Sequence, residues 1–298
     1  MLAALDQQPS YIIGGVSKNL GNNARAGAGK YFVIEADEYD RMFLGLSPLI
    51  AVITNMEHDH PDCFPTALDY QMAFQAYCQR VNPQGFILAC ADDPGVKKLL
   101  STIADKRILT YGTETGSDYQ AAEIQANPEG GYSFDILQHT LTASHNLGRV
   151  HLQVPGRHNI LNALAALVIA HQNDLDMKRA ARVLTQFSGT GRRFDVRGEV
   201  RGITIVDDYA HHPTEIRATL EGARSRYASR PLWVVWQPHT FSRTQTLFDA
   251  FTSAFNQADH VIVSEVYASR EKDNGFSAAQ VVTAMQHADA RFIPALMD

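Results

Sequence analysis

Short apolar runs alternate with longer helical segments along most of the chain, and this alternation predicts its fold. Runs rich in β-branched and aromatic residues predict strands, and they lie at residues 31–34, 49–53, 85–89, 203–206, 232–236 and 260–264. Helical patterns cover residues 67–81, 159–171 and 178–187. Strands that alternate with helices predict an α/β fold with mainly parallel sheets.

The pattern changes at two places. Residues 121–154 are polar and rich in turns, which predicts short strands and a hairpin turn at Gly130-Gly131. The sequence Gly189-Thr190-Gly191 offers flexible backbone, so we place a domain boundary near Ser188. The two expected domains are residues 1–188 and residues 189–298.

Composition narrows the class of protein. The 298 residues are 45% hydrophobic and 19% charged, which is enough to build ordinary cores and excludes a disordered chain. The net charge of −6, without a long basic run, argues against a nucleic-acid-binding surface. The three cysteines form no CxxC pair, which favours reduced thiols in a cytoplasm over a disulfide framework. No apolar stretch reaches the roughly 18 residues of a membrane span.

The most informative segment runs from Val206 to Glu215 and reads VDDYAHHPTE. A predicted short buried strand ends there in two carboxylates, a tyrosine and two histidines, and Pro213 marks the start of a helix. Ligands bind at the carboxyl ends of strands in open α/β sheets. A polar turn capped by Asp207 or Asp208 is the alternative, but a cap requires one such residue and not five.

Two further strand ends carry possible metal ligands. Residues 35–40 read EADEYD, and such a cluster suits magnesium unless it is simply a solvated acidic loop. Residues 55–62 read NMEHDHPD, which is similar to the start of an HxHxDH metallohydrolase site. Position 63 is cysteine and not the required histidine, so one histidine with a carboxylate on hydrated magnesium is favoured over a dinuclear zinc site.

Amide and basic side chains complete the candidate chemistry. Asn159 and Asn162 lie three residues apart at the start of a predicted helix, and their amides match the edge of adenine. Asn159 alone could instead be a helix N-cap. Arg192, Arg193 and the segment QPHTFSRT at residues 237–244 offer guanidinium groups for phosphate or carboxylate, with surface salt bridges as the alternative.

The pair Gly29-Lys30 superficially suggests a phosphate loop. The motif GxxxxGKS or GxxxxGKT requires glycine at position 24 and Ser or Thr at position 31, whereas the chain has Ala24 and Tyr31. A predicted strand follows where a helix would have to begin. We therefore expect no phosphate loop here.

The motifs in order define a resemblance. EADEYD, TNMEHDHPD, PGRHNILNALAAL, GTGRRFD, VDDYAHHPTEI, QPHTFSRT and SEVYASRE together are similar to the Mur ligase family over essentially the whole chain. QPHTFSRT and SEVYASRE favour members that add L-alanine to UDP-N-acetylmuramate over members that recycle the murein tripeptide. Thr240 departs from the pattern, because the alanine-adding members commonly have arginine there.

The resemblance implies a partial central ATPase domain and a partial Rossmann-like C-terminal domain. By comparison with the family, Met1 falls inside the helix that follows the phosphate loop, and the chain ends near residues 292–294 where the family continues. The implied reaction is ATP-driven formation of an amide through an acyl phosphate, and we expect this segment alone to be an inactive fragment.

The resemblance also implies roles for individual residues. Glu35 and His60 would hold Mg²⁺, Asn159 and Asn162 would contact adenine, Arg193 the ATP phosphates and Asp208 the ribose side of the nucleotide. The residues that would face the acyl phosphate and the incoming amino acid are His211, His239 and Arg243, with Tyr209 and His212 as further candidates. The alternatives are a tripeptide-recycling ligase, a non-catalytic nucleotide-binding module and a metallohydrolase.

Overall fold

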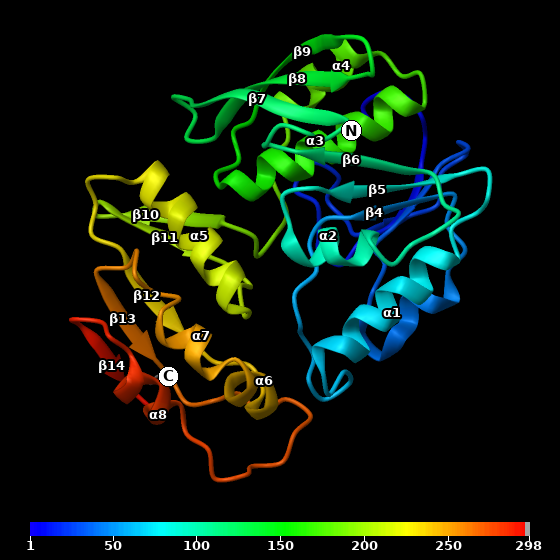
Figure 1. The fold of residues 1–298 in the computed structure, drawn as a ribbon. Helices are drawn as coiled ribbons and strands as arrows, with labels where there is room; N and C mark the ends of the chain where they lie inside the picture. The colour runs from blue at the N-terminus through cyan, green and yellow to red at the C-terminus, as the bar shows by residue number, and fades with distance from the viewer. Residues whose placement is uncertain (296–298) are drawn as a thin grey trace. The chain divides into compact units, whose positions relative to one another are not determined.

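The computed structural model describes residues 1–295, and its internal contacts divide the chain into two compact units. The first unit consists of Met1–Glu57 and Ala67–Asp207. The second begins at Asp208 and also includes His58–Thr66, a segment that leads into the first unit at both of its ends. Each unit has its own main sheet (Figure 1). Each also has its own apolar core.

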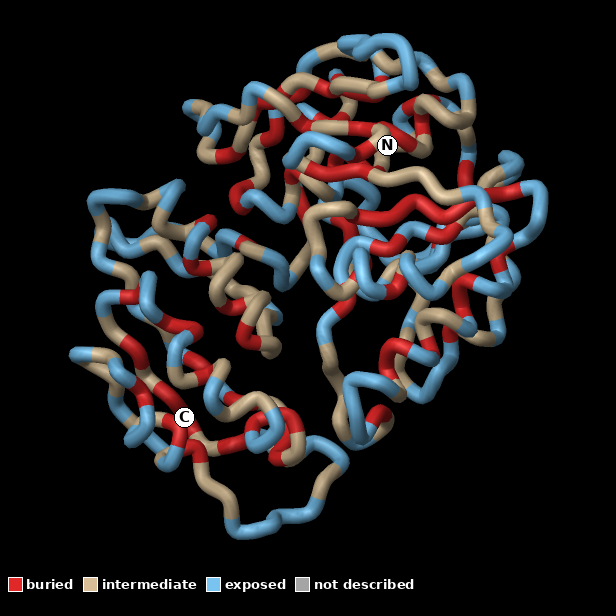
Figure 2. The backbone as a smooth tube through the Cα atoms, in the orientation of Figure 1, coloured by how far each residue is buried: buried red, intermediate tan, exposed pale blue. Residues whose placement is uncertain are grey.

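A six-stranded sheet forms the centre of the first unit. The strands lie in the order β4-β5-β6-β7-β8-β9; the first four are parallel and the last three form an antiparallel meander. Their bounds are β4 Ile50–Ile53, β5 Phe86–Cys90, β6 Ile108–Gly112, β7 Tyr119–Ala126, β8 Tyr132–His139 and β9 Ser144–His151. Every residue of β5 is buried, as expected for an inner parallel strand (Figure 2).

Helices α3 (Arg157–Gln172) and α4 (Met177–Thr185) pack on this sheet. Leu164, Leu167 and Val168 of α3 are buried in one core with residues of β5 to β9. The unit also contains α1 (Ala67–Gln79), α2 (Pro94–Leu100) and the short helix η1 (Tyr39–Gly45).

Two small sheets complete the first unit. Strands β1 (Ser10–Ile12), β2 (Ala24–Arg25) and β3 (Phe32–Ile34) lie in the order β2-β1-β3, and strands β10 (Asp195–Val200) and β11 (Ile203–Asp207) form an antiparallel pair. Their apolar side chains are largely exposed, for example Phe32 at 61% and Ile203 at 68%.

The second unit is a parallel three-stranded sheet with helices around it. Strands β12 (Trp233–Trp236), β13 (His260–Val263) and β14 (Ala290–Phe292) lie in that order. The helices are α5 (Pro213–Arg226), α6 (Phe241–Thr246), α7 (Phe248–Thr252) and α8 (Ala278–Ala284). Side chains from all four helices share one core with Trp236, Val261 and Val263.

The predicted α/β fold with mostly parallel sheets is confirmed, and every predicted strand and helix is present within a few residues of its expected bounds. The turn at Gly130-Gly131 is also confirmed, since Gly130 has φ 82° between β7 and β8. Two details were wrong. The strands β7 to β9 have eight residues each and are not short, because they pair with one another as a meander. Strand β11 is partly exposed and not buried, because within residues 1–295 it forms a ladder with β10 alone.

The predicted domain boundary near Ser188 stays a prediction. The internal contacts separate the two units at Asp207/Asp208, whereas the pair β10–β11 lies in the first unit. The last three residues of the predicted second domain, 296–298, lie outside the described residues. Within residues 1–295, each helix is too short or too polar to span a bilayer.

Candidate functional site

The candidate site in the second unit is built on a tight turn in the segment His58–Thr66. His60 has a left-handed φ of 53°, and its carbonyl oxygen accepts hydrogen bonds from the backbone N–H groups of Cys63 and Phe64, both at 2.8 Å. The Phe64 side chain is fully buried. This turn places the two acidic residues of the segment, Asp59 and Asp62, against arginines of the second unit.

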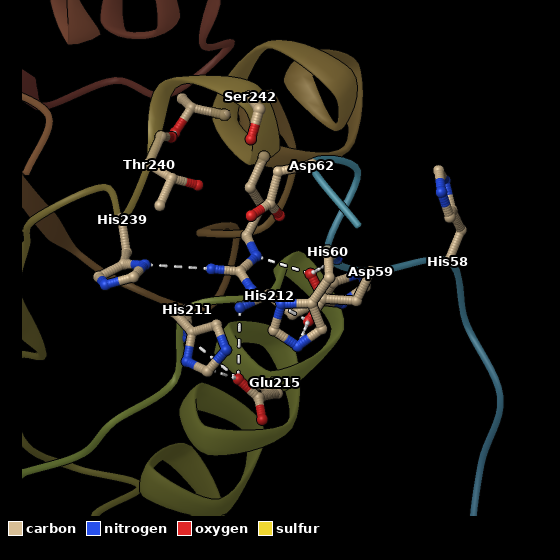
Figure 3. Close-up of polar contacts among 12 residues, drawn as sticks. His58, Asp59, His60, Asp62, His211, His212, Glu215, His239, Thr240 and Ser242 are labelled. Atoms are coloured by element: carbon tan, nitrogen blue, oxygen red, sulfur yellow. Dashed lines mark hydrogen bonds and ion pairs between the residues drawn. The ribbon is translucent and has the colours of Figure 1, made fainter. Parts of the chain in front are cut away.

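Arg243, on helix α6, forms the centre of the site. Its neighbours Asp59, His60 and His239 are labelled in Figure 3. Its Nε lies 2.7 Å from Oδ1 of Asp59 and its Nη2 lies 3.2 Å from Oδ2, so the carboxylate is held by two parallel hydrogen bonds. The Arg243 side chain is 4% exposed and that of Asp59 is 15% exposed. Burial alone would raise the pKa of Asp59, but the hydrogen bonds and charge of Arg243, helped by His60, lower it to about 2.

Two imidazoles contact the same guanidinium. Nδ1 of His239 lies 3.3 Å from Nη1 of Arg243, and Nδ1 of His60 lies 3.3 Å from Nη2. His239 is held by its position after β12, where it pairs with Tyr267 in an isolated parallel bridge. Burial, followed by the positive charge of Arg243, lowers the pKa of His239. Neutral His239 is therefore the expected form at neutral pH.

His211 is the third imidazole of the site, and its ring centroid is 6.2 Å from that of His239. Its Nδ1 lies 2.8 Å from the carbonyl oxygen of Tyr209 and 3.5 Å from Oε2 of Glu215. Burial lowers the pKa of His211, the charge of Glu215 opposes this shift and the charge of Arg243 adds to it. The Tyr209 ring packs edge-on against His211 at a centroid distance of 5.0 Å.

His212 is the N-cap of helix α5. Its Nδ1 accepts a hydrogen bond from the backbone N–H of Thr214 at 3.3 Å, Pro213 is the first helical residue, and the Glu215 carboxylate bonds back to the His212 N–H. This is a capping box with histidine in place of serine or threonine. The cap is thus His212, and the alternative in which Asp207 or Asp208 caps the helix is wrong.

Helix α6, which carries Arg243, begins in an unusual way. Thr240 precedes it with φ 68° and ψ 143°, a conformation in which a β-branched residue is a genuine outlier, and its side chain forms no cap. The cap comes instead from Glu271, which accepts hydrogen bonds from the backbone N–H of Ser242 at 3.0 Å and from its hydroxyl group. Next to Glu271, Arg270 pairs with Asp62 at 2.8 Å.

Sequence reasoning therefore identified the arginine and the histidines of this site but missed Asp59, Asp62, Arg270 and Glu271. Asp59 stands beside His60 in a motif that was singled out, and the one available signal was that a buried guanidinium needs a carboxylate partner. Asp62 ends the same motif, and Arg270 and Glu271 end the motif SEVYASRE, but neither motif indicates which side chains these residues pair with.

The predicted adenine contacts lie in the first unit, on the first turns of α3. Gly156, with φ 93°, precedes the helix, so the alternative that Asn159 is its N-cap is wrong. Nδ2 of Asn159 donates to the carbonyl oxygen of Pro155 at 2.7 Å, and Nδ2 of Asn162 lies 3.5 Å from Oδ1 of Asn159. The amide of Asn159 is thus largely engaged. Among the described residues, the exposed Asn162 side chain uses one N–H, which leaves its carbonyl oxygen and a second N–H for a ligand.

The remaining predicted residues are spread over both units. Arg193 is exposed in the turn before β10, and Glu35 is exposed after β3, where it accepts a hydrogen bond from the Gly14 N–H at 2.5 Å. Asp208, in the second unit, forms a local turn by accepting a bond from the Ala210 N–H at 2.7 Å. All three stay predictions as nucleotide or metal contacts.

The fit to a magnesium ion differs between the two predicted ligands. The exposed Glu35 carboxylate is a suitable oxygen ligand. His60 fits poorly in this arrangement, because a neutral imidazole has one lone pair and its Nδ1 faces an N–H of Arg243. In the described part of the chain, no group of three or more His, Cys, Asp or Glu side chains is arranged to hold a metal ion.

The fold and this site define an α/β protein of two units with mostly parallel central sheets, and the second unit holds an arginine–histidine cluster. The model of the Mur ligase middle domain matches residues 14–170, and that of the Mur ligase glutamate ligase domain matches residues 192–297. The chain belongs to the Mur ligase family.

Individual relatives agree with this assignment. The chain is 40% identical over 272 residues to a UDP-N-acetylmuramate–L-alanine ligase of Caldanaerobacter subterraneus, covering 91% of this chain and 58% of the relative. It is 42% identical over 294 residues to the ligase of the same name from Acidobacterium capsulatum, covering 98% and 63%. The crystal structure of a UDP-N-acetylmuramate–alanine ligase from Thermotoga maritima matches with a TM-score of 0.76 at 26% identity, covering 99% and 62%. The chain therefore spans about 58 to 63% of the length of these curated relatives.

Proposed function

We propose that this chain provides the central and C-terminal domains of a ligase that uses ATP to join L-alanine to UDP-N-acetylmuramate. The observation that carries the proposal is the convergence of three motifs on Arg243. Asp59 and His60 of TNMEHDHPD contact Arg243, as does His239, which shares QPHTFSRT with it. His211 of VDDYAHHPTEI joins the cluster through its neighbour His239. The names of relatives at 40 to 42% identity support the choice of substrates.

The chemistry of the cluster suits this reaction. ATP, with Mg²⁺, would supply the phosphoryl group that activates the muramyl carboxylate. The substrates and the acyl phosphate are anionic, and Arg243 and neutral His239 can donate hydrogen bonds to phosphate or carboxylate oxygens. Such a reaction depends on positioning and on neutralisation of charge more than on covalent help from the protein. His211, next to His239, is placed to act on the amine of the amino acid.

In this proposal, Asn162 is the main adenine contact in the first unit and Arg193 contacts the ATP phosphates. Asn159, whose amide is engaged by Pro155, supports Asn162. Asp208 would lie at the ribose, Glu35 would be the oxygen ligand of the metal, and His60 would have to leave Arg243 to join it. Tyr209 would shield His211, and His212 would act through the start of α5.

The test is phosphate release by the chain with ATP, Mg²⁺, UDP-N-acetylmuramate and L-alanine, with the full-length Acidobacterium ligase as positive control. Release that requires both substrates, together with the alanylated product in mass spectrometry, supports the proposal and contradicts the predicted inactivity. Release with the murein tripeptide in place of L-alanine would instead support the recycling ligase.

Without turnover, the proposal depends on binding. ATP is then expected to shift the amide NMR signals of Asn162 and Arg193, and L-alanine those of His211 and His239. ATP shifts alone would indicate a nucleotide-binding module. If neither ligand shifts these signals, the proposal is wrong.

A further inference from the structure

Two neighbouring imidazoles of the site, His239 and His211, face opposite kinds of hydrogen-bonding partner. His239 faces a guanidinium, whereas His211 faces a carbonyl oxygen and a carboxylate (Figure 3). A guanidinium can only donate hydrogen bonds, and a carbonyl or carboxylate oxygen can only accept them. The partners therefore decide which ring nitrogen of each neutral histidine carries the proton.

For His239, the partner is Nη1 of Arg243, 3.3 Å from Nδ1. Since this N–H donates, Nδ1 must be the accepting nitrogen and the proton lies on Nε2. Asp59 fixes the geometry, because its carboxylate takes Nε and Nη2 of the same guanidinium and leaves Nη1 for the histidine. Glu271 caps the helix from which Arg243 projects.

For His211, the same reasoning gives the opposite tautomer. Nδ1 lies 2.8 Å from the Tyr209 carbonyl oxygen and 3.5 Å from Oε2 of Glu215, and both partners require a proton on Nδ1. The lone pair of neutral His211 then lies on Nε2. Among residues 1–295, the hydrogen bonds and ion pairs of the His211 ring involve Nδ1, and the side chain is 21% exposed.

We infer that His211 is the proton acceptor of this site through Nε2, and that Arg243, oriented by Asp59, holds neighbouring His239 in the opposite tautomer as a hydrogen-bond donor. Asp59 is thereby a positioning residue. The identity of the proton donor rests on the proposed function, in which the ammonium group of L-alanine must lose a proton before its nitrogen can attack.

Burial favours neutral His211. Burial lowers its pKa, Glu215 and the Tyr209 carbonyl raise it, Arg243 lowers it and Asp59 raises it. The pKa of His239 is lowered by burial, Arg243, His211 and Arg270, and is raised by Glu271. Both rings therefore enter the reaction in the neutral form in which the two tautomers differ.

The proposed step is balanced in atoms and charge. Nε2 of His211 takes one proton from the ammonium group, and the amine lone pair forms the bond to the carbonyl carbon of the acyl phosphate. The bond from that carbon to the phosphate oxygen then breaks, and the electron pair leaves with the phosphate. The second amine proton departs with the phosphate as hydrogenphosphate, and the His211 imidazolium returns its proton to water. In the part of the chain that the structure describes, the hydrogen bond of the His239 ring involves Nδ1, so its Nε2–H can donate to an oxygen of the reacting group.

The tautomers can be measured directly on the chain without any activity. Long-range proton–nitrogen correlation NMR of isotope-labelled histidine rings, at mildly alkaline pH, distinguishes protonated from unprotonated ring nitrogens. We expect Nδ1–H for His211 and Nε2–H for His239, with signals assigned by their loss in His211→Gln and His239→Gln. His211 in the Nε2–H form, or a mixture of both tautomers, would overturn the inference.

Asp59→Asn tests the positioning role. Release of Arg243 is expected to leave His239 as a mixture of tautomers, whereas His211 keeps Nδ1–H because its partners are the Tyr209 carbonyl and Glu215. Asp135→Asn is the matched control, since Asp135 pairs with Arg149 at 2.6 Å in the first unit. It should change neither ring. An unchanged His239 in Asp59→Asn would contradict the role given to Asp59.

The ligase assay separates this inference from the proposed function. If turnover is present, His211→Gln should lower kcat by on the order of a hundredfold with little change in the KM for L-alanine, because a general base acts in the transition state. The expected tautomers in a chain that shows neither ligation nor the NMR shifts with ATP and L-alanine would mean that the proposed function is wrong while the tautomer assignment holds. Ligation that persists in His211→Gln would mean that His211 is not the proton acceptor.

Discussion

At the scale of single residues, the buried charge of Arg243 has the largest energetic consequence. A buried ion pair adds little to stability over a well-packed apolar pair, but removal of one partner leaves an uncompensated charge and is strongly destabilising. Asp59 and Arg243 are such a pair, with exposures of 15% and 4%. Asp62 and Arg270 are more exposed, at 23% and 41%, and solvent screens their attraction.

The two pairs predict unequal effects of similar substitutions. Asp59→Asn should reduce the free energy of unfolding of the second unit by about 3 kcal/mol. Asp62→Asn should reduce it by less than about 1 kcal/mol. Urea unfolding followed by tryptophan fluorescence measures this unit specifically, because the two tryptophans of the chain, Trp233 and Trp236, both lie in β12. Equal losses in the two variants would contradict the assigned difference in burial.

The Asp59 carboxylate also predicts that the stability of the second unit falls in acid. The pKa of Asp59 is about 2 in the folded chain, below its ordinary value of 3.8, so its contribution to stability is complete above the ordinary value and is lost as the pH falls toward 2. A shift of this size corresponds to about 2 kcal/mol. The difference in unfolding free energy between the original chain and Asp59→Asn, measured by urea titration at decreasing pH, should shrink across this range. A difference that is constant with pH would show that the Asp59 carboxylate is not held by Arg243.

The predictability of the site from sequence differs between residues for a physical reason. His239 and Arg243 follow β12 of a parallel sheet, and ligands bind at the strand ends of such sheets. His211 follows β11, and its signal was the cluster of polar side chains after that strand. Asp59 and Glu271 act on Arg243 from positions 184 and 28 residues away along the chain. Their roles depend on which loops meet in the folded unit, and no local pattern contains that information.

At the scale of elements, the pairing of β4 with β5 depends on one glycine. Gly85 lies immediately before β5, and a Cβ there would come 1.6 Å from the carbonyl oxygen of Leu49. That oxygen accepts the hydrogen bond of the Phe86 N–H, which is the first link between the two strands. An added methyl group would have to displace backbone, which adjusts less readily than a side chain.

Gly85→Ala should therefore destabilise the first unit by about 2 kcal/mol or more and weaken the start of the β4–β5 ladder. Hydrogen exchange of the β5 amides measures the effect. Gly45→Ala is the matched control, because a Cβ at Gly45 would meet no atom within 4 Å. If the two variants exchange alike, the close approach at Gly85 is not a constraint on the sheet.

The elements themselves were predictable where the apolar pattern was long or continuous. Strand β5 and helix α3 are unmistakable because nearly all of their inward positions are apolar. Helix α2 was missed although Asp93 caps it and Pro94 is its first residue, because seven residues are too few for a periodic pattern. Strand β14, with three residues, is defined by its pairing with β13 and not by its composition.

At the scale of the whole molecule, the division into units cannot be obtained from a linear reading. The segment His58–Thr66 lies between β4 and α1 in sequence, yet its contacts belong to the second unit. The reason is chemical: Asp59 and Asp62 find their partners in Arg243 and Arg270. A boundary chosen from flexible glycines marks where the chain can bend, whereas the units are defined by where side chains find partners.

The edge of the sheet in the second unit predicts that copies of the chain associate with one another. Strand β12 is an outer strand in the order β12-β13-β14, and its alternate residues Trp233 and Val235 are 60% and 59% exposed. An apolar edge strand with open backbone groups is a template for pairing with another chain, and a lysine on the edge opposes such pairing. We expect concentration-dependent association of the chain in analytical ultracentrifugation, and Val235→Lys should reduce it while changing stability by less than about 0.5 kcal/mol.

Leu141→Lys is the control, because Leu141 is fully exposed in the turn after β8 and lies on no sheet edge. Association that is weakened equally by both substitutions would reflect general surface hydrophobicity, and an original chain that stays monomeric at every concentration would show that β12 is not an associating edge.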